Sequence, residues 1–149
     1  MTRVIAPTDF SEASRVGLRA ARAHAGRIGA TVVMVHVWDR DALTFHSAAL
    51  RSVEAENQML IRSIEDQLQE RLDAASAELF DGFEGVESRT LHDGSPARAI
   101  AEFAEPDDII VLATHGRTGF KRVLIGSVAE KLVRLAPCPV LTIPARDSA

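Results

Sequence analysis

The chain has 149 residues, 46% of them apolar and 26% charged, which suits one globular domain with a single core and excludes a disordered or fibrous protein. Its net charge of −4 argues against general binding to nucleic acid or to an anionic membrane, because both need a broad basic surface. A single cysteine, Cys138, excludes an internal disulfide and a zinc cluster of the cysteine type.

Five short apolar runs alternate with longer helix-like stretches along the chain. The runs are RVIAP (3–7), TVVMVHVW (31–38), VESRTL (86–91), DIIVLA (108–113) and PVLTIP (139–144). The second and fourth are almost continuously apolar, as is typical of parallel strands covered on both faces. We therefore predict an α/β fold in which residues 1–149 form one domain around a doubly wound parallel sheet.

Helices are expected in the four gaps between these strands. The first begins at Ser11, and Gly26 and Gly29 are its candidate ends. In the third, Ser95 is the expected N-cap and Pro96 the first helical residue, where its missing N–H costs nothing. The fourth is SVAEKLVRLA (127–136). The second is long and is predicted from an apolar stripe at spacings of four and seven, formed by Val53, Leu60, Ile64, Leu68, Leu72 and Leu79.

The candidate site lies at the carboxyl ends of the first and fourth strands, where ligands bind in sheets of this kind. APTD (6–9) follows the first strand and THGRTG (114–119) follows the fourth. The stretch 113–136 carries a charge of +4, against −8 for the rest of the chain. Residues 113–126 of this stretch form a glycine-rich, basic loop that contains Gly116, Arg117, Gly119, Lys121, Arg122 and Gly126.

Two common phosphate-binding motifs do not fit this loop. The dinucleotide fingerprint G-x-G-x-x-G would stand directly after the first strand, where the chain has APTDFSEAS (6–14). A Walker A loop needs a lysine between its last glycine and the Ser or Thr, but Gly126 is followed at once by Ser127. A classical NAD fold and an ordinary P-loop ATPase are therefore not expected.

The spacing alone leaves two interpretations of the loop open. Gly126, Ser127 and Val128 would present free amides at the positive end of a helix, and Arg117 would add charge-assisted contacts to a phosphate. Alternatively, Gly126 only turns the chain and Ser127 caps the helix. Asp9 also has two possible roles, as a ligand-binding residue or as a helix N-cap. Its position between a strand and a helix favours the N-cap.

The chain resembles the universal stress protein family of the ATP-binding kind, whose motif is G-x2-G-x9-G-[ST]. Gly116 matches the second glycine, and Gly126 with Ser127 completes the motif after nine intervening residues, while Ala113 replaces the first glycine. VIAPTDFSEAS (4–14), VVMVHVWD (32–39), GSPARAIAEFAE (94–105) and the segment 126–144 also resemble the family, in the family's order.

The resemblance implies an open, five-stranded Rossmann-like sheet of strand order 3-2-1-4-5 with about four helices. It implies that the Val37 backbone meets adenine and that Asp9 meets the ribose hydroxyls of ATP, with or without Mg²⁺ or Mn²⁺. It also implies a homodimer formed through the last strand, Val140 to Ile143. The expected nucleotide-binding residues are Pro7, Thr8, Asp9, Val37, Ala113, Thr114, His115, Gly116, Arg117, Thr118, Gly119, Gly126, Ser127 and Val128.

The expected function is that of a nucleotide-gated regulatory module in a stress response, read by a protein partner that the sequence does not name. The only acid between Ala113 and Leu135 is Glu130, well inside the last helix, so we expect ATP hydrolysis to be slow at most. Two alternatives are a nucleotide-free scaffold of the same fold, favoured by Ala113, and a receiver-like domain phosphorylated at Asp93.

The N-terminal residues lack the apolar core of a signal peptide, and no run of about 18 apolar residues is present to span a bilayer. We therefore expect a cytoplasmic protein with no membrane insertion.

Overall fold

The computed structural model describes residues 1–41, 54–115 and 125–145, with the backbone alone for 54–57 and 115. Its sheet has five parallel strands in the order β3-β2-β1-β4-β5, which confirms the predicted doubly wound fold. The strands are β1 (Arg3–Pro7), β2 (Thr31–Trp38), β3 (Val86–His92), β4 (Ile109–His115) and β5 (Val140–Ala145). The helices in the described ranges are α1 (Glu12–Ile28), α3 (Glu54–Leu79), α4 (Pro96–Phe103) and α5 (Ser127–Leu135).

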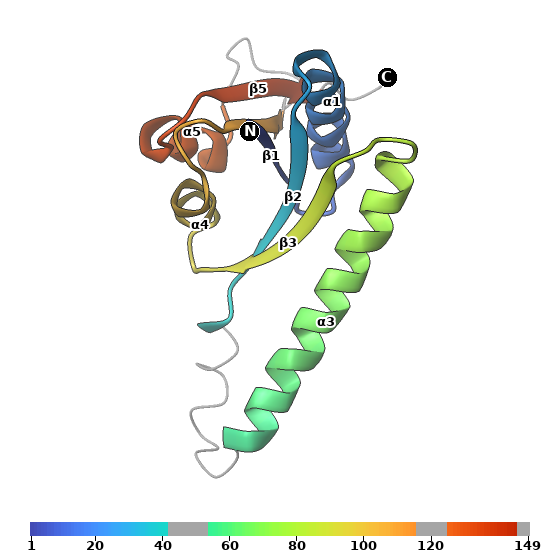
Figure 1. Ribbon diagram of the computed structural model, residues 1–149. Coiled ribbons are helices and arrows are strands. Elements are labelled where there is room, and N and C mark those ends of the chain that lie inside the picture. The colour runs from blue at the N-terminus through green and yellow to red at the C-terminus, as the bar shows by residue number, and fades with distance from the viewer. Residues whose placement is uncertain (42–53, 116–124, 146–149) are drawn as a thin grey trace.

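The helices form two layers, with α1 and α3 on one face of the sheet and α4 and α5 on the other (Figure 1). Alternate residues of β1 serve the two cores, since Val4 packs with Leu18 and Leu72 while Ile5 packs with the α4 and α5 side chains. Such two-sided burial explains why β2 and β4 are almost continuously apolar.

Three of the predicted helix ends are confirmed by their capping contacts. The Ser11 side chain accepts a hydrogen bond from the Ser14 amide at 3.1 Å, and Ser95 accepts one from the Arg98 amide at 3.4 Å. Gly29 is the C-cap of α1 in the left-handed conformation, φ 66°, which glycine adopts without strain. Gly26 lies inside α1 and does not end it.

The predicted apolar stripe of the long helix is wrong at its N-terminal side. Leu60 is 52% exposed, whereas the neighbouring Ile61 is only 8% exposed and shares a face with the buried Leu72. A helix turns by about 100° per residue, so Ile61, 11 residues before Leu72, lies on almost the same side of the helix as Leu72. Leu60, 12 residues before Leu72, is rotated away from that side by roughly 120°. The N-terminal half of α3 extends past the edge of the sheet (Figure 1), and Val53 lies outside the described residues.

Candidate functional site

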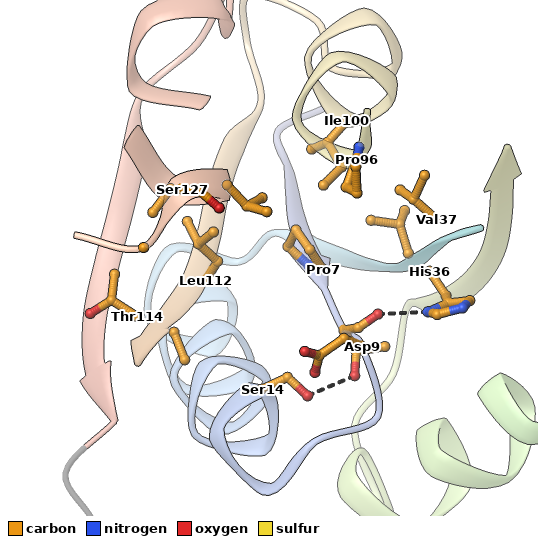
Figure 2. A pocket seen from close by; sticks show the side chains of 16 residues that line it. Pro7, Asp9, Ser14, His36, Val37, Pro96, Ile100, Leu112, Thr114 and Ser127 are labelled. Atoms are coloured by element: carbon orange, nitrogen blue, oxygen red, sulfur yellow. Dashed lines mark hydrogen bonds between the residues drawn. The ribbon is translucent and has the colours of Figure 1, made fainter. Parts of the chain in front are cut away.

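A pocket of about 330 Å³ opens at the carboxyl ends of β1, β2 and β4, facing the N-terminal ends of α1, α4 and α5 (Figure 2). Its volume is in the range of small-molecule sites. The residues that line it are Pro7, Thr8, Asp9, Ser14, Val35, His36, Val37, Pro96, Ile100, Leu112, Ala113, Thr114, Gly126, Ser127, Val128 and Ala129.

The pocket gathers nine of the predicted site residues from four separate segments of the chain. They are Pro7, Thr8, Asp9, Val37, Ala113, Thr114, Gly126, Ser127 and Val128. His115 is the last residue of β4. Residues 116–119, which include Gly116 and Arg117, lie outside the described residues. The structure therefore brings most of the predicted set together, and its role in binding remains a prediction.

Sequence reasoning missed seven lining residues, but their positions carried a signal. Ser14 lies one helical turn after the N-cap Ser11, so it faces the same end of α1. His36 directly precedes Val37, and Pro96 follows the recognised cap Ser95. The remaining four are the apolar residues Val35, Ile100, Leu112 and Ala129.

Thr8 is buried, and its polar groups are engaged within the protein. Its amide donates to the Val35 carbonyl at 2.8 Å, and its hydroxyl lies 2.9 Å from Ser14 Oγ. The same hydroxyl accepts from the Phe10 amide at 3.0 Å, while the Thr8 carbonyl lies 2.9 Å from His36 Nδ1 (Figure 2). Thr8 therefore fixes the turn that follows β1.

Asp9 is not the N-cap of α1, because Ser11 occupies that position. Its carboxylate instead accepts a hydrogen bond from the Ser11 amide at 2.9 Å. Burial raises the pKa of Asp9, but hydrogen bonds from Ser11 and Ser14 outweigh it and leave the pKa below its ordinary value. Asp9 is thus ionised at neutral pH, and its carboxyl group lies on the side of the turn that faces Thr114, away from His36 (Figure 2).

The N-terminus of α5 differs from those of α1 and α4 in having no side-chain cap. Gly126 is its N-cap, with φ −59°, and Ser127 is the first helical residue, so Ser127 does not cap the helix. A Cβ atom at Gly126 would meet nothing within 4 Å among the described residues. Neither the backbone conformation nor this packing requires glycine, so the missing side chain leaves open space beside the free amides of the first helical turn.

The pocket therefore joins three chemical environments. One part is apolar, with Val35, Val37, Ile100 and Leu112. The second contains Asp9, the one acidic residue among those that line the pocket in the described chain. The third is the positive end of α5, where backbone N–H groups suit an anion. A ligand with a flat apolar group, hydroxyls and a phosphate matches this arrangement.

Ala113, which replaces the first glycine of the motif, fits its place in β4. Phe10 is the one non-glycine residue with positive φ in the described part of the chain, so the Ala113 backbone is ordinary for an alanine. Asp93, the residue of the receiver alternative, is not among the pocket residues and is bound by Arg98 at 2.6 and 3.0 Å.

The family model of the universal stress protein family matches residues 1–144. The chain belongs to this family. Universal stress protein MJ0577 of Methanocaldococcus jannaschii is 30% identical over 158 residues, which cover 98% of this chain and 96% of that relative. None of the helices in the described ranges is long and apolar enough to span a membrane.

Solved structures of family members have the same architecture. MJ0577 superposes with a TM-score of 0.72 at 28% identity, covering 99% of this chain and 98% of that one. UspA of Lactobacillus plantarum gives 0.65 at 27% identity, covering 95% and 97%. The universal stress protein of Archaeoglobus fulgidus in complex with dAMP gives 0.58 at 23% identity, covering 96% and 97%, a likeness of the fold alone.

Proposed function

We propose that this family member binds ATP in the pocket described above and acts as a nucleotide-gated regulatory module. The observation that carries the proposal is the juxtaposition, in one pocket, of the Asp9 carboxylate and the uncapped N-terminus of α5. The A. fulgidus relative solved with dAMP supports an adenine nucleotide as the ligand class.

The chemistry of the lining suggests how the nucleotide would lie. Adenine would occupy the apolar part, beside the Val37 backbone, and Asp9 would accept hydrogen bonds from the ribose hydroxyls. The phosphates would meet the amides of Gly126, Ser127 and Val128 at the positive end of α5. The walls would be completed by Pro7, Thr8, Ala113 and Thr114. The remaining phosphate contacts would come from His115 and residues 116–119, with or without Mg²⁺ or Mn²⁺.

Regulation is the proposed role because the lining residues are poorly equipped for turnover. Phosphoryl transfer needs a positioned nucleophile and acids that hold a metal ion, whereas Asp9 is assigned here to the ribose. ATP would then act by stabilising one conformation or assembly, to the extent of its differential affinity for the two states. A turnover above about 1 s⁻¹ would contradict this role.

The test begins with nucleotide that co-purifies with the protein. Denatured protein is analysed by chromatography for released nucleotide, and stripped protein is titrated with ATP by calorimetry. Released ATP, or micromolar binding of ATP by the stripped protein, supports the proposal. A stripped protein that gives no heat with ATP would instead favour a scaffold of the same fold that acts through protein partners.

We also propose a homodimer formed through Val140 to Ile143. β5 is at the edge of the sheet, where backbone groups on one side have no strand partner among the residues that the structure describes. Leu141 in β5 is 39% exposed, and Val133 and Leu135 in α5 are 58% and 55% exposed. A second copy that pairs along β5 would cover the strand edge.

A further inference from the structure

The turn between β1 and α1 is built around Phe10, whose φ of 63° is the left-handed conformation that disfavours a bulky side chain. The Phe10 amide donates to Thr8 Oγ1 at 3.0 Å. The Ser11 amide reaches across Phe10 to Asp9 Oδ1 at 2.9 Å. Because this second bond spans Phe10, a rotation of the Phe10 backbone would move the Asp9 carboxyl group relative to α1.

Side chains from two other elements hold the Phe10 ring in place. The His36 ring of β2 lies 4.5 Å from it, centroid to centroid, and the Arg71 guanidinium of α3 lies 4.2 Å from its centroid. His36 is itself fixed by the bond between Nδ1 and the Thr8 carbonyl. Ring packing and cation–π attraction thus stabilise, from outside the turn, a backbone conformation that the turn alone disfavours.

We propose that Phe10, held by His36 and Arg71, is a positioning residue that orients the Asp9 carboxylate towards the ribose hydroxyls of ATP. The inference rests on the proposed function and deepens it, since it makes ribose recognition depend on a side chain that does not line the pocket. Phe10 and Arg71 are both absent from the lining set, whereas His36 belongs to it. Variants of Phe10 and Arg71 therefore test positioning without removing a pocket wall.

The readout is the preference for ATP over 2′,3′-dideoxy-ATP, measured by calorimetry on stripped protein. The ribose hydroxyls bonded to a carboxylate should give the unaltered protein a preference of about tenfold or more. In Phe10→Ala the preference should fall to about twofold or less, because Asp9 is no longer held in one orientation. Phe10→Tyr keeps the aromatic ring and should retain the preference for ATP. Arg71→Gln should lower that preference to about threefold.

Two further variants separate positioning from stability. Phe83→Ala removes a ring that packs against Phe80 at 6.0 Å and does not line the pocket, so it should destabilise the fold and leave the ratio unchanged. Phe10→Gly relieves the backbone strain that Phe10→Ala keeps, so it should be the more stable of the two and should retain more of the preference for ATP.

The outcomes distinguish this inference from the function on which it rests. If the unaltered protein binds no ATP, both fail together. If it binds ATP and its dideoxy analogue equally, nucleotide binding stands and the ribose role of Asp9 is overturned, and with it this inference. If the preference is present but survives in Phe10→Ala, or in Arg71→Gln should Phe10→Ala not fold, only the positioning role of Phe10 is overturned.

Discussion

A Cβ atom on Gly17 of α1 would lie 2.6 Å from the backbone nitrogen of Ala113 in β4. This is closer than two such atoms approach without displacement, so glycine lets α1 pack directly on the backbone of β4. Ala113 and the next residue, Thr114, line the pocket. A helix residue that packs directly on β4 therefore helps to place one wall of the site.

The first prediction follows from this contact. Gly17→Ala should lower the free energy of unfolding by about 2 kcal/mol, because the clash with β4 exceeds the gain in helix propensity. It should also weaken ATP binding by moving Ala113. Gly26→Ala in the same helix is the matched control, since its Cβ would be 3.9 Å from the Phe83 ring, an ordinary contact. Urea unfolding should find Gly26→Ala more stable by about 0.5 to 1 kcal/mol.

The N-terminus of α5 yields a second prediction, in which stability and binding change in opposite directions. In Gly126→Asp, the new carboxylate should cap the free amides of the first turn and raise the stability of nucleotide-free protein by a few tenths to about 1 kcal/mol. The same carboxylate would occupy the proposed phosphate site and repel the ligand. Calorimetry should therefore find ATP affinity reduced by about 100-fold or more.

Gly126→Ala is the control for this substitution. Its Cβ meets nothing within 4 Å in the described part of the chain, and the φ of −59° suits alanine, so the fold should tolerate it. Its binding loss should be clearly smaller than that of Gly126→Asp, because it adds no charge. If Gly126→Asp bound ATP as well as the unaltered protein, α5 would not be the phosphate site.

A third prediction concerns the pH dependence of stability at the start of the sheet. Asp108 is buried and accepts hydrogen bonds from Arg3 at 2.9 and 2.6 Å. Burial raises the pKa of Asp108, but the bonds from Arg3 and from the Glu105 amide outweigh it, so the pKa is lower than in the unfolded chain. The resulting stability is present above the unfolded pKa of about 4 and is lost as pH falls through the folded value.

Asp108→Asn should therefore cost about 2 kcal/mol at neutral pH, and this cost should shrink below about pH 4, where protonation weakens the native pair. Asp107→Asn, at an exposed neighbour, is the control and should change stability little. Urea unfolding from pH 7 down to pH 3 measures both. A cost of Asp108→Asn that stayed constant over this range would exclude the ion pair as its cause.

Much of the fold was predictable because burial on both faces leaves a strong pattern in a short strand. The predicted limits of β1 and β2 are those of the structure. The face of α3 was harder to predict, since Leu60 and Ile61 are both apolar and adjacent. Which of the two side chains is buried depends on its rotation about the helix axis relative to Leu72 and on how far α3 extends past the sheet.

The site was predictable where a residue follows a strand end and harder where tertiary contacts decide. Asp9 and Ser127 were predicted for the candidate site from their place in the chain and the motif spacing, and both line the pocket. No local pattern predicts a positive φ at Phe10, because contacts with His36 and Arg71, distant in sequence, stabilise it. The identity of the α5 cap was also open, since Gly126 and Ser127 both occur at such positions.

The last prediction tests the proposed dimer at Thr142. The Ile110 amide donates to the Pro139 carbonyl at 3.0 Å, and Ile110 is paired with Val140. Successive amides of a strand in a parallel sheet point alternately to the two sides. In this register the amides of Leu141 and Ile143 point towards β4, and the amide of Thr142 points outward. Thr142→Pro should therefore remove a hydrogen bond to the second copy while keeping those to β4, and light scattering should find a monomer that is still folded.

Leu141→Pro is the contrasting variant, because it removes an amide that faces β4 and should destabilise the monomer itself by about 3 kcal/mol or more. Pro144 already stands in β5 at a position of the Thr142 type, which indicates that the outer side tolerates proline. If Thr142→Pro stayed dimeric, the interface would lie elsewhere, with the exposed Val133 and Leu135 of α5 as the next surface to alter. An unaltered protein that was already monomeric would rule out the dimer altogether.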